Sequence, residues 1–187
     1  MIQNKEDLRE YLECDKYALG LTNQKHPRIF GDEIWKFEIL LRKYEYYTNV
    51  HSFFNGLFLF YYKFRFHQLA LKLGFSIPIN VFGKGLSIAH YGSIVVNSNC
   101  KIGDYCRIQE NVTIGSTNGE WEAATIGNNV FIASGARLIG NINIGNNIAI
   151  GANAVVVHSF NEDGITIAGI PAKKISENGS NKFIRRK

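Results

Sequence analysis

The sequence predicts a mainly β fold, a left-handed parallel β-helix preceded by a small α-helical segment. Three observations predict it. A branched apolar residue recurs every six residues in the second half of the chain, glycine, asparagine and aspartate recur between these positions, and the first 74 residues show helical spacing instead. The six-residue series is Ile102, Ile108, Ile114, Glu120, Ile126, Ile132, Leu138, Ile144, Ile150 and Val156.

A period of six fits a triangular coil of extended backbone. Each six-residue unit forms one side, three sides complete a turn of about eighteen residues, and the branched residue points inward. An α-helix cannot bury one face with this period, because it has 3.6 residues per turn. Glycine, asparagine and aspartate tolerate the backbone conformations that the corners need. The repeat extends back to about Ile77, and Cys100 and Cys106 fall at inward positions as small core residues.

The repeat is interrupted once, within residues 116–124. Asn118 and Glu120 occupy positions that are apolar elsewhere in the series, and twelve residues separate Ile114 from Ile126. We expect this segment to leave the coil as a loop that faces the substrate, because loops on a regular scaffold often carry function. The alternative is a decorated corner of the coil.

Residues 5–74 have helical spacing, with Leu8, Tyr11 and Leu12 on one face and Ile34, Phe37, Leu40 and Leu41 on another. A third helix is expected from about Ser52 to Gly74, and it is unusually aromatic. We expect its aromatic residues to pack on the end of the β-helix or on another subunit. Weak contact with a membrane surface, helped by Lys63, Arg65 and Lys72, is the alternative.

These patterns divide the chain into three parts. Residues 1–75 form the helical segment, residues 76–172 the β-helix, and residues 173–187 a basic C-terminal tail. The net charge is +5, partly from the tail, which we interpret as a solvated, frayed terminus. Attraction to a polyanion, such as anionic lipid or cofactor phosphates, is the alternative.

Composition also narrows the class of function. No nucleic-acid-binding motif is present, so nucleic acid is not an expected partner. The three cysteines form no CxxC pair, the N-terminus has no secretory pattern, and the densest apolar run, residues 53–62, is too short to span a membrane. We therefore expect a cytoplasmic protein. Histidines at metal-ligand spacing are missing, so no bound metal is expected.

Four sequence stretches resemble the serine acetyltransferases, which are hexapeptide-repeat acyltransferases. These stretches are residues 85–96 (GLSIAHYGSIVV), 102–104 (IGD), 111–115 (NVTIG) and 168–174 (AGIPAKK). The resemblance covers about residues 77–175, whereas the N-terminal helices are much shorter than is typical of that family. Length and general character also resemble the short O-acetyltransferases of surface-polysaccharide gene clusters.

The resemblance implies an O-acetyltransferase that uses acetyl-CoA as co-substrate and His90 as general base. A neutral imidazole is suited to removing the proton from a hydroxyl group, and such a base typically contributes about 10²- to 10⁴-fold in rate. The family also implies a homotrimer whose active sites lie between subunits, consistent with closed symmetry.

Departures from the family pattern bear on the acceptor. The serine enzymes carry an aspartate directly before this histidine, where this chain has Ala89, and a carboxylate that orients the imidazole, where this chain has Phe75. They also carry a second histidine in the loop that corresponds to residues 116–124, which has none here. We therefore expect the acceptor to be a sugar hydroxyl of a surface or capsular polysaccharide or its precursor. Serine, as in cysteine biosynthesis, is the alternative, and a non-catalytic β-helix scaffold is an alternative of another class.

Glu110 lies twenty residues after His90, about one turn on, and is a candidate to orient the imidazole in place of the missing carboxylate. An exposed polar face is the equally weighted alternative. Tyr91, beside His90, and Glu120 and Trp121, in the loop, are the candidate acceptor-binding residues.

The acetyl-CoA groove is predicted from a column of small side chains. Ser116, Ser134 and Ala152 are eighteen residues apart and should stack on one another, with Gly135 adjacent. Small side chains there would let the pantetheine arm approach the backbone, although they also suit tight corners. Lys173 and Lys174 are the candidates to pair with the cofactor phosphates as point charges.

Overall fold

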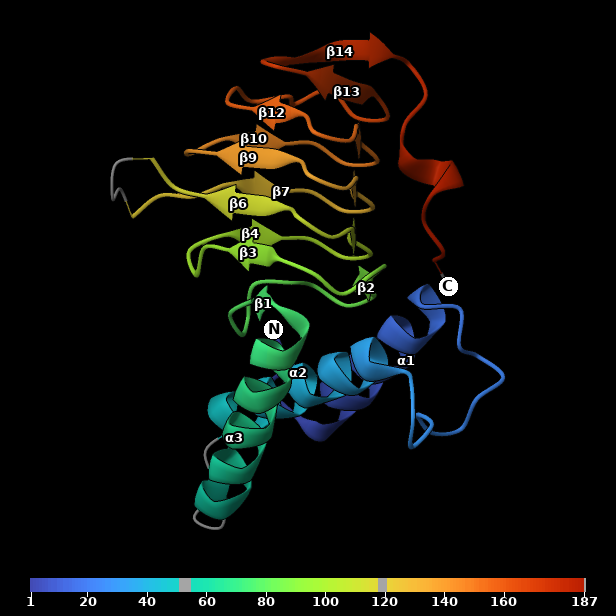
Figure 1. The fold of residues 1–187 in the computed structure, drawn as a ribbon, viewed down its shortest axis with the longest axis vertical. Coiled ribbons are helices and arrows are strands. Elements are labelled where there is room, and N and C mark those ends of the chain that lie inside the picture. The colour runs from blue at the N-terminus through green and yellow to red at the C-terminus, as the bar shows by residue number, and fades with distance from the viewer. Residues whose placement is uncertain (51–54, 118–120, 187) are drawn as a thin grey trace.

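The computed structural model describes residues 1–50, 55–117 and 121–186, in which helices come first and a stack of short strands follows. The helices are α1 (Lys5–Ala18), α2 (Glu33–Asn49) and α3 (Asn55–Leu73). Figure 1 shows them gathered at one end of the molecule, below a column of stacked strand layers that ends with β14. This order agrees with the predicted layout.

The strands form three sheets, one for each side of the coil. The first contains β1 (Phe75–Ser76), β3 (Ile94–Val96), β6 (Thr113–Gly115), β9 (Arg137–Ile139) and β12 (Val155–Val156). The second contains β4 (Lys101–Ile102), β7 (Thr125–Ile126) and β10 (Asn143–Ile144). The third contains β2 (Ser87–Ile88), β5 (Arg107–Ile108), β8 (Phe131–Ile132), β11 (Ala149–Ile150), β13 (Thr166–Gly169) and β14 (Ala172–Ser176), with the pairing parallel except between β13 and β14.

Strand register gives the length of each turn. Thr125 pairs with Asn143, eighteen residues later, as the repeat predicts. Lys101 pairs with Thr125, twenty-four residues later, so this turn holds six extra residues. The extra residues lie between β6 and β7, where the described residues on either side of 118–120 form a loop that leaves the coil. Figure 1 shows it projecting from the stack next to β6.

The interior of the coil is filled by the predicted apolar columns. Ile108 pairs with Ile132, which pairs with Ile150, and all three side chains are fully buried. Cys100 and Cys106 are buried inward as expected. Alternation of buried and exposed positions along each short strand is what a sheet with one buried face requires.

Polar side chains form a ladder along one corner of the coil. The backbone N–H of Asp104 donates to Asn128 Oδ1, and the N–H of Asn128 donates to Asn146 Oδ1, each at 2.8 Å. Asn129 and Asn147, the residues that follow, adopt left-handed backbone conformations with φ of 55°. The corners thus use asparagine as the sequence pattern predicted.

The third helix ends at Leu73, followed by Gly74 with φ of 77°, which confirms the predicted C-terminus. Its predicted start near Ser52 lies outside the described residues. The aromatic residues of α3 divide between two faces. Phe66 stacks on Phe37 of α2 with ring centroids 5.1 Å apart, and Phe37 in turn packs edge-on against Phe75 in the coil. The expected packing on the end of the coil is thus confirmed for this face, whereas the other face is exposed.

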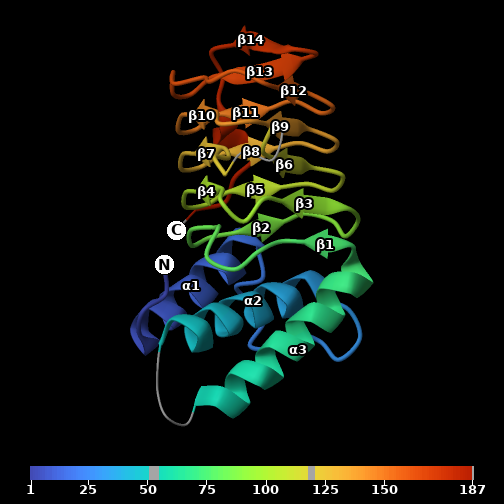
Figure 2. The same ribbon diagram turned by 90° about the vertical axis from the view of Figure 1, so that its left-hand side faces the viewer.

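A buried charged cluster joins the helices to the first turn of the coil. Arg42 of α2 is fully buried and donates from Nε to Asp15 Oδ2 of α1 at 2.7 Å and from Nη1 to Glu45 Oε2 at 3.0 Å. The same guanidinium donates to the backbone carbonyls of Phe82 and Gly83. Figure 2 shows α2 lying directly beneath the lowest turn of the coil. A buried charge is tolerated only when it is paired and hydrogen-bonded, as it is here.

The C-terminal tail is ordered against the coil, which corrects the expectation of a solvated, frayed terminus. Strand β14 crosses the predicted start of the tail at residue 173 and pairs antiparallel with β13. Ser180 is buried and its N–H donates to the Asn147 carbonyl at 2.9 Å. Phe183 stacks on Phe131 with ring centroids 4.5 Å apart. Apolar contact with an exposed sheet position therefore outweighs the solvation of the neighbouring cations.

Candidate functional site

His90 lies at the corner of the coil that follows β2, and its side chain is exposed. The register of β2 on β5 pairs Ile88 with Ile108, which brings Glu110 to the position of His90 on the next turn. The sequence prediction that Glu110 lies one turn on is therefore confirmed.

Glu110 is held in place by its neighbours. Ser134 Oγ donates to Glu110 Oε1 at 2.7 Å, and this hydrogen bond is the main cause that lowers the pKa of the Glu110 carboxyl. Gly92 lies against Glu110, because a Cβ on Gly92 would be 3.2 Å from Glu110 Cβ. Gly92 also has φ of 137°, which a larger residue rarely adopts.

The second carboxylate oxygen of Glu110 is unusual. Glu110 Oε2 is buried and has no hydrogen-bond partner among the described residues. A buried carboxylate oxygen normally accepts a hydrogen bond, so an unpaired one indicates a position where a donor is expected to arrive. An imidazole N–H from His90 and a substrate hydroxyl are donors of the right kind.

The small-residue column differs from the predicted one. Ser134 stacks on Glu110 and not on Ser116, because the loop makes this turn twenty-four residues long. Ser116 lies at another corner, where its Oγ accepts from Asn97 Nδ2 at 3.2 Å. Ala152 does lie one turn above Ser134, since Ile150 pairs with Ile132. The corrected column is therefore Glu110, Ser134 and Ala152.

Gly135 borders this column. Its N–H donates to the Glu110 carbonyl at 3.0 Å, and its φ of 76° suits glycine. A Cβ on Gly135 would lie 2.1 Å from Asn153 Oδ1, so the Asn153 side chain would have to move to make room for it. Ala152 is exposed and Ser134 is half-buried, so the column presents small groups to solvent at the corner that carries His90. Such a surface can accommodate a thin, extended ligand.

A small pocket of about 210 Å³ is lined by the chain neighbours of His90, but not by His90 itself, and contains residues that the sequence analysis missed. Ala89 and Tyr91 line it from the coil, whereas Asp32, Glu33 and Trp35 line it from the start of α2. The pocket thus receives carboxylates from the helical segment, although the adjacent coil position is Ala89. A motif within the repeat gives no signal for them, because only the packing of α2 brings them to this corner.

Asp32 is a stable anion in this pocket. Arg28 donates to it from Nη2 at 2.8 Å, from Nε at 3.0 Å and from its backbone N–H at 2.9 Å. These hydrogen bonds lower the pKa of Asp32 to about 2, so it is ionised at neutral pH. Both carboxylate oxygens of Asp32 are thus engaged by Arg28, which offsets the charge of Asp32.

The other predicted site residues are not gathered around His90 within one chain. Trp121 is 85% exposed and belongs to the loop between the first and second sheets, whereas His90 lies between the third and first. Glu120 lies outside the described residues. Phe75 is buried and pairs with Ile94, so it contributes no polar group to the site.

The two predicted phosphate-binding lysines differ from one another. Both are exposed, but Lys174 Nζ lies 2.6 Å from Glu162 Oε1 and 2.8 Å from Glu177 Oε1. Hydrogen bonds to these carboxylates raise the pKa of Lys174 and offset its charge. Lys173 is therefore the better candidate for a phosphate contact. Within the described part of the chain, no group of three His, Cys, Asp or Glu residues could hold a metal ion.

No family model matches the chain. It is 38% identical over 116 residues to a serine acetyltransferase of Synechococcus elongatus, an alignment that covers 60% of this chain and 47% of the relative. It is 40% identical over 99 residues to a serine acetyltransferase of Staphylococcus xylosus, covering 52% of this chain and 45% of the relative. The chain spans about half the length of the curated relatives it matches.

Solved structures extend the likeness to the helices. The serine acetyltransferase of Brucella abortus superposes with a TM-score of 0.70 at 25% identity, covering 94% of this chain and 71% of that one. A second structure of that enzyme, in complex with coenzyme A, gives 0.69 at 22% identity, covering 94% of this chain and 70% of that one. The resemblance inferred from the sequence is thus confirmed: the chain is similar to the serine acetyltransferases, a hexapeptide-repeat group of acyltransferases.

Proposed function

We propose that the protein is an acetyl-CoA-dependent O-acetyltransferase with His90 as general base. The observation that carries the proposal is the exposed His90 beside Glu110 and the column of small residues, in the part of the chain that is similar to serine acetyltransferases. Structures of such enzymes in complex with coenzyme A support acetyl-CoA as the donor substrate.

In this mechanism, the His90 imidazole removes the proton from the acceptor hydroxyl as its oxygen attacks the acetyl carbonyl of the thioester. The new C–O bond forms, the C–S bond breaks, and the imidazolium returns its proton to the departing thiolate. Glu110 accepts a hydrogen bond at its free Oε2 and so positions the imidazole or the acceptor. Ser134 keeps Glu110 in its rotamer through the 2.7 Å hydrogen bond.

Serine is the acceptor that the comparisons favour, although the sequence analysis placed it second. The relatives named above are serine acetyltransferases. The pocket lined by Ala89 and Tyr91 also contains Glu33, which is the candidate to hold an ammonium group in place of an acidic residue directly before His90. A sugar hydroxyl is the second candidate, favoured by the apolar Ala89 and Phe75 where the family has carboxylates.

A thiol-release assay tests the proposal. Acetyl-CoA is supplied with serine, monosaccharides, nucleotide sugars or oligosaccharides, and the free thiol is measured. We expect turnover with one acceptor class and a loss of about 10²- to 10⁴-fold in His90→Ala. His158→Ala, at another exposed corner histidine, is the matched control and should retain full activity. Full activity of His90→Ala would refute the mechanism, and turnover of sugars alone would refute serine.

We also infer that the coil is left-handed and that the protein is a homotrimer with its active sites between subunits, as the resemblance implies. The separation of Trp121 and His90 onto different corners supports this, because a site that uses both would need a second chain. Light scattering after gel filtration should give roughly three times the 21.1 kDa chain mass. A monomer at assay concentration would contradict the inference.

A further inference from the structure

Helix α3 carries a second apolar face that no described residue covers. Its exposed side chains are spaced three and four residues apart, which places them on one side of the helix. We define the outer face of α3 by these residues and their exposed fractions: Leu57 (78%), Phe60 (69%), Tyr61 (47%), Phe64 (53%) and Leu71 (67%). The opposite side packs on α2 through Phe66, so this second face is not needed to hold α3 in place.

Positive charge flanks the outer face on both sides. In helical projection Lys63 lies on one flank, and Arg65 and Lys72 lie on the other. The sequence of α3 contains no aspartate or glutamate, so nothing on the helix offsets these cations. Apolar aromatic residues between lysine and arginine are typical of helices that lie in a membrane interface.

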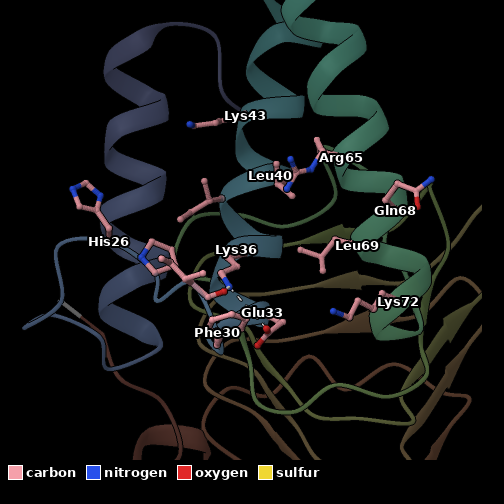
Figure 3. A pocket seen from close by; sticks show the side chains of 13 residues that line it. His26, Phe30, Glu33, Lys36, Leu40, Lys43, Arg65, Gln68, Leu69 and Lys72 are labelled. Carbon is pink, nitrogen blue, oxygen red and sulfur yellow. Dashed lines mark hydrogen bonds and ion pairs between the residues drawn. The ribbon is translucent and has the colours of Figure 1, made fainter.

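A cationic pocket of about 810 Å³ adjoins the same helix. Lys36 and Lys43 line it from α2, and Arg65 and Lys72 line it from α3, against a single acidic residue, Glu33. Figure 3 shows Arg65 and Lys72 on the α3 side of this pocket. Lys36 is engaged with the Ile29 carbonyl at 2.8 Å, whereas Arg65 and Lys72 lie at the edge of the outer face.

The rim of the pocket opposite α3 is also apolar and exposed. Ile29 and Phe30, in the segment between α1 and α2, are 87% and 91% exposed and line the pocket. Figure 3 shows Phe30 on the side of the cationic cavity away from Arg65 and Lys72 of α3. An interfacial surface has the same composition, with acyl chains beside anionic headgroups.

We propose that the outer face of α3 and this pocket dock the protein on an anionic lipid surface, with lipid phosphate groups beside Arg65 and Lys72. Charge selects this occupant over a second copy of the chain. Two α3 helices packed face to face would bring their flanking cations together, which is unfavourable, whereas an anionic surface is complementary to them. Within the described residues, no helix is long and apolar enough to cross a membrane, so the docked helix lies on the surface.

Flotation with vesicles tests the proposal without reference to catalysis, so its outcome is separate from that of the proposed function. The full chain is mixed with vesicles of phosphatidylglycerol and phosphatidylcholine in equal parts, or with phosphatidylcholine alone. We expect binding to the anionic vesicles only, weakened by high salt as for any surface charge interaction. Inorganic phosphate and glycerol phosphate at matched ionic strength should not displace the protein, because they lack the apolar part.

Two variants separate the apolar and charged contributions. Phe60→Ser with Phe64→Ser should weaken vesicle binding by at least about tenfold, since two large side chains lose their burial. Arg65→Ala with Lys72→Ala should weaken it by about fivefold for each charge removed. Ile175→Ser is the matched control, because Ile175 is also 64% exposed but lies on β14 at the far end of the coil.

Three results would overturn the proposal. Equal binding to neutral vesicles would remove the role of charge, and unchanged binding of the Phe60→Ser, Phe64→Ser protein would remove the role of the outer face. No vesicle binding, with a change of oligomeric state in that double variant, would identify a second copy of the chain as the occupant. Circular dichroism of each variant confirms that it is folded, as expected for substitutions at exposed positions.

Discussion

Glycine at the corners of the coil is required by close approach between turns, and Gly127→Ala tests this. A Cβ on Gly127 would lie 2.7 Å from Asn146 Oδ1 and 2.8 Å from the carbonyl carbon and oxygen of Gly145 on the next turn. Ordinary contact begins near 3.4 Å, so the turns would have to separate by roughly 0.6 Å at this corner. Two hydrogen bonds of 2.8 Å oppose that movement, from Gly127 N to Ile144 O and from Asn128 N to Asn146 Oδ1.

Overpacking of this kind costs about 1–3 kcal/mol in the free energy of unfolding. For a chain of this size, each kcal/mol corresponds to about 2–4 °C in Tm, so the expected decrease is about 2–12 °C. Thermal unfolding followed by circular dichroism measures it. Gly56→Ala is the control, because a Cβ there meets nothing within 4 Å and alanine is the better helix former.

The direction of the Tm change in the two variants tests whether the corner is close-packed. Gly127→Ala should lower Tm, whereas Gly56→Ala should leave it unchanged or raise it slightly. The φ of Gly127 is not positive, so a loss in Gly127→Ala reports the contact and not backbone strain. A Tm for Gly127→Ala within about 1 °C of the wild type would show that the turns can separate freely, and the close-packed corner would be refuted.

Three further predictions concern titratable groups. Ser134→Ala should raise the pKa of Glu110, because it removes the hydrogen bond that lowers it. A lowered carboxyl pKa stabilises the folded protein only at pH values above the pKa of that group in the unfolded chain, so the free energy of unfolding, measured by urea titration, should fall by about 1 kcal/mol at pH 7 and hardly at all at pH 3. An equal loss at both pH values would contradict this prediction. Burial and the charge on Asp15 raise the pKa of Glu38 well above its usual value, so the folded protein keeps a proton that the unfolded chain loses and stability falls as pH rises. Glu38→Gln should therefore have a higher Tm than the wild type at pH 8 and the same Tm at pH 4, and a lower Tm at pH 8 would refute this. Burial raises the pKa of Cys106 to about 12, so Ellman's reagent should react with this thiol only after unfolding, and prompt reaction of the folded protein would contradict its buried position.

The repeat made most of the coil predictable, since its period reports directly which side chains point inward. The inward columns follow from counting residues, and counting placed Glu110 about one turn beyond His90; the twenty-residue register of β2 on β5 then brings it to the His90 position. The same counting misplaced Ser116, because the number of residues that leave the coil within 116–124 is not fixed by the period. A turn of twenty-four residues brings Ser134 over Glu110 instead.

Contacts between segments that are distant in the sequence could not be predicted from the repeat. Asp32 and Glu33 enter the pocket beside His90 only because α2 packs against the first turn. The tail is ordered by the stacking of Phe183 on Phe131, in a sequence whose charge suggests solvation. Both are tertiary effects that local composition does not encode.

His90, the proposed general base, lies on a turn of the coil that has no complete turn beneath it, and the helices supply the hydrogen-bond acceptors that this turn lacks. Strand β2 is the last strand of its sheet, so every second backbone N–H there faces away from the coil with no strand to accept it. Buried side-chain oxygens of two acidic residues accept them instead: Asp15 Oδ1 from Gly85 and Leu86, at 2.7 and 2.9 Å, and Glu38 Oε1 from Ile88, at 3.1 Å.

These bonds explain why charged side chains are buried in the helical segment at all. Each of these hydrogen bonds fixes the backbone of the first turn, and the one from Ile88 to the protonated Glu38 side chain lies two residues before His90. A purely apolar cap would leave the same N–H groups unpaired, at a cost of about 1–3 kcal/mol each. The helical segment therefore acts as the cap of the coil, and the precision of that cap determines how rigidly the imidazole is presented.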